Sequence, residues 1–337
     1  MTSNEIHEFV LTKSKYITLE AAELSILPDL ATQIQSYIAL GPPKQRPAET
    51  IFVVSFGFWD IYDFSRMDYP LGQNGTDTSI KELFSQLDRL YNHFVTNLYP
   101  PEEPGVPDSV KSTMNNINTP SFRVIIPKLF DPTLLPGWLT LRPAPPAPSC
   151  IAEQQKNAVY LTQRWNNLVE NQVAAWVLTH PTLEQGSSHD NVRRSASPPA
   201  STADEASTDD QEPESSAVEK DVFYFDLPKL LLDIIVEHQL EDESLSDASG
   251  LGTGESPFES VYQPCVREAD VDDTDSLVDL KGMLICKEPE EYLFWDSFNL
   301  GSVVKRMIGK GVGEMVKENK SLRQQWKGIK NRISSDH

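Results

Sequence analysis

The feature that most constrains the fold is an alternation of short apolar runs with longer segments of helical periodicity. The apolar runs are rich in β-branched or aromatic residues and cover 51–56, 122–126, 222–225 and 292–295. The segments with apolar residues at helical spacing are 80–98, a long stretch after the proline-rich loop 142–148, a stretch that begins at 230, and 303–315. Strands that alternate with helices in this way predict a parallel sheet covered on both faces, so we expect a three-layer α/β/α sandwich.

One segment interrupts this alternation. Residues 184–219 contain no Ile, Leu, Met, Phe, Tyr or Trp and are dominated by Ser, Pro, Asp and Glu, so they predict a disordered acidic insert. The motif at 193–198 within it resembles a phosphorylation site, and a solvated loop without a regulatory role is the alternative. A second acidic stretch, 268–279, predicts an exposed loop.

The insert divides the chain into the parts of one predicted domain. The two domain portions are 26–183 and 220–320, on either side of the insert at 184–219. A poorly defined segment, 1–25, precedes them, and a polar tail, 321–337, follows them.

Charge limits the partners that the chain can bind. Fifty acidic residues against 29 basic ones give a formal net charge of −21, which disfavours nucleic acid and anionic membranes as partners.

No stretch approaches the roughly 18–20 apolar residues that span a bilayer. Residues 1–20 lack the basic and apolar regions of a signal peptide, so we expect a cytoplasmic protein as written, and a secreted one if a further segment precedes Met1.

The cysteines are consistent with the cytoplasmic expectation. Cys150, Cys265 and Cys286 do not predict a disulfide framework, because a pair plus a free thiol would need an oxidising compartment. For the same reason the sequons at Asn74 and Asn319 carry little weight without secretion.

Two loops are the candidates for a functional site. In open parallel sheets ligands bind beyond the carboxyl ends of the strands. Residues 55–60 follow the first apolar run directly, and residues 295–301 lie between the last apolar run and the last helical segment.

The residues in these loops resemble conserved blocks of the SGNH/GDSL ester-hydrolase family. Gly57-Phe58-Trp59-Asp60 is similar to that family's Gly-x-Asn-Asp block, and the stretch from Asp296 to Asn299 is similar to its Asp-x-x-His block. Between these blocks, Pro127 and Asn157 are similar to the family's proline-bearing loop and asparagine-bearing helix. The stretch 28–34 resembles the helix that precedes the Gly-x-Asn-Asp strand, so the likeness covers roughly residues 26–316.

The resemblance implies a mostly parallel, flavodoxin-like sheet and an ancestral hydrolase acting on acyl or carbohydrate esters, with a small acyl or carbohydrate ligand. Gly57, Trp59 and Asp60 would line the oxyanion hole and cleft, Asp296 would be a relict of the catalytic block, and Asn299 would occupy the position of the histidine. Since residues 1–25 contain no run that predicts a strand, we expect the sheet to lack the family's first strand.

The catalytic residues of the family are largely missing. No Gly-Asp-Ser block is present, Trp59 replaces the asparagine donor, and Asn299 cannot accept a proton near neutral pH. We therefore expect an inactive protein. Two alternatives remain open: a hydrolase whose nucleophile lies upstream of Met1, and a non-enzymatic binding or scaffold protein on the same fold, with an unknown protein partner.

Other residues offer no clear chemistry. Trp59 and Trp295 could pack the cleft shut or form an aromatic platform for a ligand. Gly309, Gly311 and Gly313 lie within the last helical segment rather than in a phosphate-binding loop. His93 is expected at the surface and His238 at a helix end, and no residue cluster predicts a metal or a cofactor.

Overall fold

The computed structural model describes most of the two predicted domain portions. The described residues are 10–12, 29–41, 50–98, 121–142, 150–178, 218–240, 256–268, 277–278 and 283–325. The phosphorylation motif, residues 184–217 of the predicted insert and residues 326–337 of the predicted tail therefore lie outside the described residues. Within the predicted insert Val218 is described, and it is buried in the main core.

The central sheet is parallel, as the alternation predicts. Its strands lie side by side in chain order and pair in parallel along the whole sheet: β1 (Val10–Thr12), β2 (Ile51–Ser55), β3 (Phe122–Pro127) and β4 (Lys220–Phe225). The expectation that residues 1–25 contain no strand is wrong, because β1 pairs Val10 with Val53. A flavodoxin-like order needs one reversal of direction across the sheet, and the described strands of this sheet have none.

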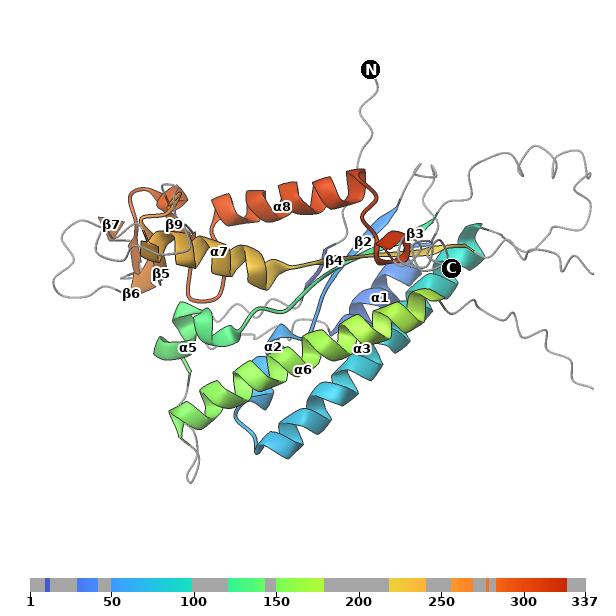
Figure 1. The fold of residues 1–337 in the computed structure, drawn as a ribbon, viewed down its shortest axis with the longest axis horizontal. Helices are drawn as coiled ribbons and strands as arrows, with labels where there is room; N and C mark the ends of the chain where they lie inside the picture. The colour runs from blue at the N-terminus through green and yellow to red at the C-terminus, as the bar shows by residue number, and fades with distance from the viewer. Residues whose placement is uncertain are drawn as a thin grey trace, which may run out of the picture.

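Helices from the described ranges cover one face of this sheet. Right-handed crossovers that all advance in the same direction place their helices on the same side of a sheet. Figure 1 shows them there together: α1 (Leu30–Ala39), α3 (Tyr69–Leu98) and α6 (Ile151–Leu178). Asp29 caps the N-terminus of α1, since its Oδ1 accepts a hydrogen bond from the Thr32 backbone nitrogen at 2.7 Å.

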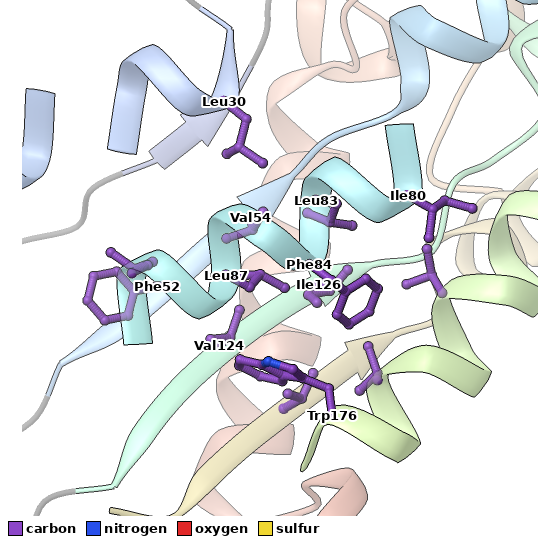
Figure 2. Close-up of a cluster of buried hydrophobic side chains, with 14 of the residues drawn as sticks. Leu30, Phe52, Val54, Ile80, Leu83, Phe84, Leu87, Val124, Ile126 and Trp176 are labelled. Carbon is purple, nitrogen blue, oxygen red and sulfur yellow. The ribbon is translucent and has the colours of Figure 1, made fainter. Parts of the chain in front are cut away.

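The main core lies between the sheet and these helices (Figure 2). Val54 of β2 and Val124 of β3 are fully buried there against Leu87 of α3. Aromatic rings pack together in this core, where Trp176 of α6 and Tyr91 of α3 both meet Phe122, with ring centroids 6.2 and 5.3 Å away. This packing is the hydrophobic stripe that the helical periodicity predicts.

Helix α3 begins earlier than predicted, at Tyr69 rather than near residue 80. Its first turns carry glycines because other elements approach closely. A Cβ added at Gly75 would lie 3.0 Å from the Phe64 ring, and one at Gly72 would lie 3.0 Å from a Leu161 methyl group. Tertiary packing here overrides a sequence of low helix propensity.

The other face of β4 meets α8 (Ser302–Lys317), which Figure 1 shows opposite α6. The contact is close at Gly311, where an added Cβ would lie 3.1 Å from the Phe225 ring.

Helix α7 (Leu227–Leu240) follows β4 and helps to form a second buried cluster with residues such as Leu293 and Val304. As expected, His238 lies at the end of α7, where its Nε2 is 2.9 Å from the Glu259 carbonyl oxygen.

Short strands and 3₁₀ turns complete the second portion. These elements are β5 (Ser260–Pro264), β6 (Val266–Glu268), β7 (Leu277–Val278), β8 (Met283–Ile285), η2 (Pro289–Glu291) and β9 (Tyr292–Phe294). Strand β5 pairs in parallel with β9, and β8 pairs antiparallel with both β6 and β7. The loop predicted over 268–279 is thus wrong at Glu268, which ends β6 and is exposed, and at 277–278, which form β7; residues 269–276 and 279 lie outside the described residues.

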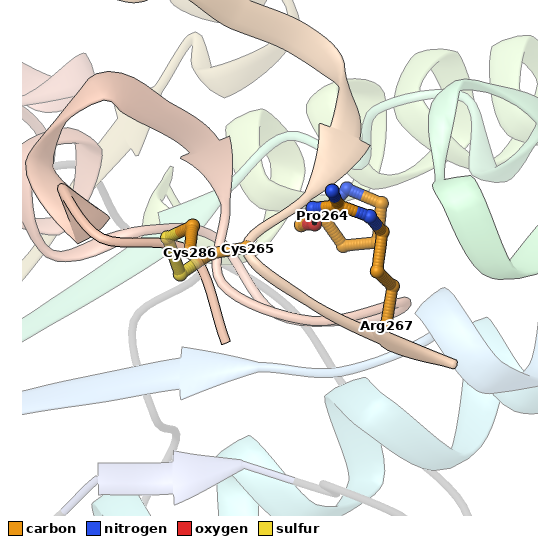
Figure 3. Close-up of a disulfide and its surroundings, with 4 residues drawn as sticks. All are labelled: Pro264, Cys265, Arg267 and Cys286. Atoms are coloured by element: carbon orange, nitrogen blue, oxygen red, sulfur yellow. Dashed lines mark hydrogen bonds between the residues drawn. A yellow bond between two sulfur atoms is a disulfide. The ribbon is translucent and has the colours of Figure 1, made fainter. Parts of the chain in front are cut away.

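The structure also corrects the prediction for the cysteines. Cys265 and Cys286 form a disulfide, with Cα atoms 4.9 Å apart (Figure 3), while Cys150 is free and exposed. The antiparallel pairing of β6 with β8 brings the two half-cystines together, since Val266 lies opposite Ile285. This proximity is a tertiary effect that spacing along the chain does not reveal.

The predicted C-terminal tail begins with residues that pack on the domain. Ser321 is fully buried, and its hydroxyl donates to Asp221 at 3.1 Å. The Arg323 guanidinium donates to the backbone carbonyl of Val177 at 2.8 Å and to that of Lys220 at 3.2 Å. This segment therefore joins the end of α6 to the start of β4.

Candidate functional site

The first predicted loop turns sharply after β2. Gly57 has a φ of 98° and begins the short helix α2 (Phe58–Phe64). A Cβ at this position would lie 2.2 Å from the Trp165 ring, so both the backbone and the packing require glycine. The turn directs Trp59 and Asp60 into the first turn of α2, where an acidic side chain is favoured by the helix dipole.

The second predicted loop follows β9 and is closed by its own hydrogen bonds. Oδ1 of Asp296 accepts from the backbone nitrogens of Phe298 and Asn299 at 2.8 and 2.7 Å. The side-chain amide of Asn299 donates to both carboxylate oxygens of Asp296, at 3.1 and 2.8 Å. Both oxygens of the Asp296 carboxylate are thereby hydrogen-bonded within the loop, and the amide of Asn299 beside them cannot accept a proton near neutral pH.

The structure brings the two predicted loops together through aromatic rings. Trp59 and Phe298 have ring centroids 5.2 Å apart, and Tyr62 also meets Phe298 at 6.0 Å. We call the whole group, which adds residues from the segment after β3, the strand-end aromatic cluster: Phe58, Trp59, Tyr62, Phe130, Trp138 and Phe298. The two predicted loops therefore lie close together, but the prediction that residues 292–295 form a strand of the central sheet is wrong, because β9 pairs with β5 in a separate sheet.

Gly137, which the sequence analysis did not single out, fixes the position of the Phe298 ring. Gly137, in the short helix α5 (Pro136–Thr140) that follows η1 (Pro132–Leu134), donates its backbone N–H to the Ser297 carbonyl at 2.8 Å. A Cβ at Gly137 would lie 2.7 Å from the Phe298 ring. The Phe298 ring is therefore held between α5 and α2.

Arg142 is a second residue that the sequence did not single out. Its guanidinium lies over the Trp138 and Tyr62 rings, 3.9 and 4.2 Å from their centroids. It donates to the Tyr62 carbonyl and to the Ser65 hydroxyl, both at 2.6 Å, and to the Gln154 side chain at 2.9 Å. Burial lowers the pKa of Arg142 and raises that of Tyr62.

Asn157, which the resemblance placed on a helix after the proline-bearing loop, is buried on α6. Its side-chain nitrogen donates to the backbone carbonyls of Ser65 and Met67 at 3.4 and 3.1 Å. Asn157 therefore holds the turn that follows α2, and this contact is a structural one.

The histidines in the described ranges, His93 and His238, lie on other elements. His93 is on α3, where its Nε2 is 2.8 Å from the Asn97 side chain, and its ring is 6.0 Å from that of Tyr37. Burial lowers the pKa of His93. The hydrogen-bond contacts of these two histidines are with Asn97 and with the Glu259 carbonyl, and neither is with a serine.

Other kinds of site were also sought in the described ranges. Within them no group of three or more His, Cys, Asp or Glu side chains could hold a metal ion. Among these same residues, no helix has the length and apolar character needed to cross a membrane. A hollow between α7 and α8 and another beside α6 lie away from the strand-end aromatic cluster.

The arrangement is that of a strand-end loop cluster closed by aromatic packing, without a hydrolytic triad among the described residues. A search with models of known protein families finds no match to this sequence, and a comparison with curated proteins finds none either.

Proposed function

We propose that the chain is an SGNH/GDSL-hydrolase-like protein, ancestrally a carboxylic-ester hydrolase, that no longer hydrolyses esters. The observation that carries this proposal is the pairing of Asn299 with Asp296, in which an amide nitrogen donates to the carboxylate that would otherwise orient a histidine. An amide cannot serve as a general base near neutral pH, so the serine activation on which such hydrolases depend is lost.

The proposal includes the three-layer architecture of that family. Its support is the position of α8 against β4, on the side away from α6 (Figure 1), with Gly311 allowing close contact to Phe225. The strand order is the point at which the likeness is weakest, because the described strands follow the order of the chain.

The aromatic contacts favour a closed cleft over an open aromatic platform. Trp59 is half-buried between the Tyr62 and Phe298 rings, at 5.5 and 5.2 Å, and so contributes to packing. Trp295 is 40% exposed and keeps part of its ring available for a small acyl or carbohydrate ligand. Loss of hydrolysis is therefore compatible with retained binding.

The test compares the unmodified chain with the Asn299→His variant. Each is incubated with a fluorophosphonate probe and with a short-chain p-nitrophenyl ester. We expect neither protein to be labelled or to hydrolyse the ester above a control preparation, because a restored histidine still has no activated serine to serve. An Asn171→His variant, at an exposed position of α6, controls for a histidine introduced elsewhere.

Stoichiometric labelling of the unmodified chain at one serine, located by peptide mass, would overturn the proposal. A large rise in ester hydrolysis for Asn299→His but not for Asn171→His would also contradict it, since that result requires a nucleophile near residue 299.

A further inference from the structure

The buried disulfide bears on the compartment in which the chain folds. Cys265 is 0% exposed and Cys286 is 5% exposed. The disulfide (Figure 3) lies within a hydrogen-bonded framework. The Cys286 backbone nitrogen donates to the Cys265 carbonyl at 2.9 Å, and the Cys265 backbone nitrogen donates to the Phe294 carbonyl at 3.0 Å. Such bonds persist in oxidising compartments such as the secretory lumen and are rare where glutathione keeps thiols reduced.

The disulfide changes the weight of the two sequons. The printed sequence contains Asn74-Gly75-Thr76 and Asn319-Lys320-Ser321, and both asparagines are exposed. Asn74 lies on the solvent side of α3, whereas Asn319 lies in the turn after α8 with a φ of 53°. A bulky glycan at either position would extend into solvent without displacing core residues.

From these observations we infer that Asn74 and Asn319 are N-glycosylation sites and that the chain folds in an oxidising secretory lumen. In the transfer, the asparagine amide nitrogen forms a bond to the anomeric carbon of a lipid-linked oligosaccharide. The bond from that carbon to the lipid diphosphate breaks, the diphosphate leaves, and the amide loses one proton. Disulfide formation passes two electrons and two protons to a luminal disulfide-exchange partner.

The hydroxyl residues of the sequons indicate when the transfer occurs. Thr76 and Ser321 are both 0% exposed, and their hydroxyls donate to the Gly72 carbonyl at 2.9 Å and to Asp221 at 3.1 Å. A transferase that must contact these hydroxyls can do so only before they are buried. The glycans are therefore added to the unfolded chain, and folding then leaves the modified asparagines on the surface.

The experiment uses the full chain purified from the cells that naturally express it, with free thiols alkylated during lysis. We expect alkylation at Cys150 alone without reduction, and at all three cysteines after reduction. Peptide-N-glycosidase treatment should shift the mobility of the protein. In heavy-oxygen water it should convert Asn74 and Asn319 to labelled aspartate.

Variants expressed in the same cells assign each site. Asn74→Gln and Asn319→Gly should each remove one glycan step, and glycine suits the positive φ at position 319, so folding is preserved. Thr76→Ser keeps a sequon, and Asn167→Gln changes an exposed asparagine outside any sequon, so both should leave the mobility unchanged.

Alkylation of all three cysteines without reduction would overturn the assignment of the compartment. Absence of a glycosidase-sensitive shift would overturn both glycosylation sites, and a shift that persists in one variant would overturn the site changed in that variant. None of these results depends on ester hydrolysis, so they are separate from the test of the proposed function.

Discussion

Replacing Gly57 by alanine should be among the most destabilising small substitutions in the domain. A non-glycine residue in the left-handed region costs about 1–2 kcal/mol, and forcing extra volume into a packed core costs about 1–3 kcal/mol more. Both terms apply here, since φ is 98° and the new Cβ would lie 2.2 Å from the Trp165 ring. We expect the free energy of unfolding to fall by about 2–5 kcal/mol.

Two further glycines separate these terms. Gly41 has a φ of 70° with nothing within 4 Å of an added Cβ, so Gly41→Ala should show the backbone cost alone, about 1–2 kcal/mol. Gly309 lies in α8 with an equally open Cβ position, and Gly309→Ala should stabilise by up to about 1 kcal/mol.

The assay is urea unfolding followed by far-ultraviolet circular dichroism, with the free energy obtained by linear extrapolation. The double variant of Gly57→Ala with Trp165→Phe should lose less than the sum of its parts, because phenylalanine lacks the ring atoms that the new Cβ would strike. Equal losses for Gly57→Ala and Gly41→Ala, with additive behaviour in the double variant, would refute the close-approach argument.

Three other predictions concern stability. Arg164 donates two hydrogen bonds of 2.8 Å to the Asp77 carboxylate and lowers its pKa in the folded protein. The resulting contribution to the free energy of unfolding is present above the pKa that Asp77 has in the unfolded chain. It is lost as the pH falls through the pKa that Asp77 has in the folded protein. Asp77→Asn should therefore flatten the acid limb of a stability–pH curve, and an unchanged limb would contradict this. Replacing Cys265 and Cys286 by serine, which opens a loop with a sequence separation of 21, should cost about 3 kcal/mol in urea unfolding under non-reducing conditions and nothing beyond the serine effect under reducing ones. Asn157→Ala should cost about 1–3 kcal/mol, because buried backbone carbonyls after α2 lose their donor; a loss under 0.5 kcal/mol would be too small for that role.

The sheet and its main helices could be predicted from the sequence because each is a continuous pattern. The run at 51–56 corresponds to β2, and the stripe at 80–98 lies within α3. The start of α3 could not be predicted, since Gly72 and Gly75 lower helix propensity and are there to admit neighbouring side chains. β1 escaped notice because a strand of 3 residues is too short to show a period.

The candidate site was predicted in outline only. Asp296 and Asn299 were both singled out from the sequence, but their contact, which the structure has at 2.8 Å, was not predicted. Gly137 and Arg142 could not be found in the same way, because they act through contacts with elements far away in the chain and occupy segments without periodicity. The Cys265–Cys286 bond was missed for the same physical reason.

The position of Arg323 has a consequence for the evolution of chain length. Its guanidinium donates to the Val177 carbonyl, which precedes the predicted acidic insert at 184–219, and to the Lys220 carbonyl, which follows it. One side chain therefore contacts the chain on both sides of that insert. When the ends of a loop are already close together, lengthening it adds only about 0.6 kcal/mol of loop-closure free energy for each doubling of its length. This junction is therefore a place where the gene could accept duplicated or transposed coding sequence, and where a fluorescent reporter domain could be grafted while the α/β domain continues to fold.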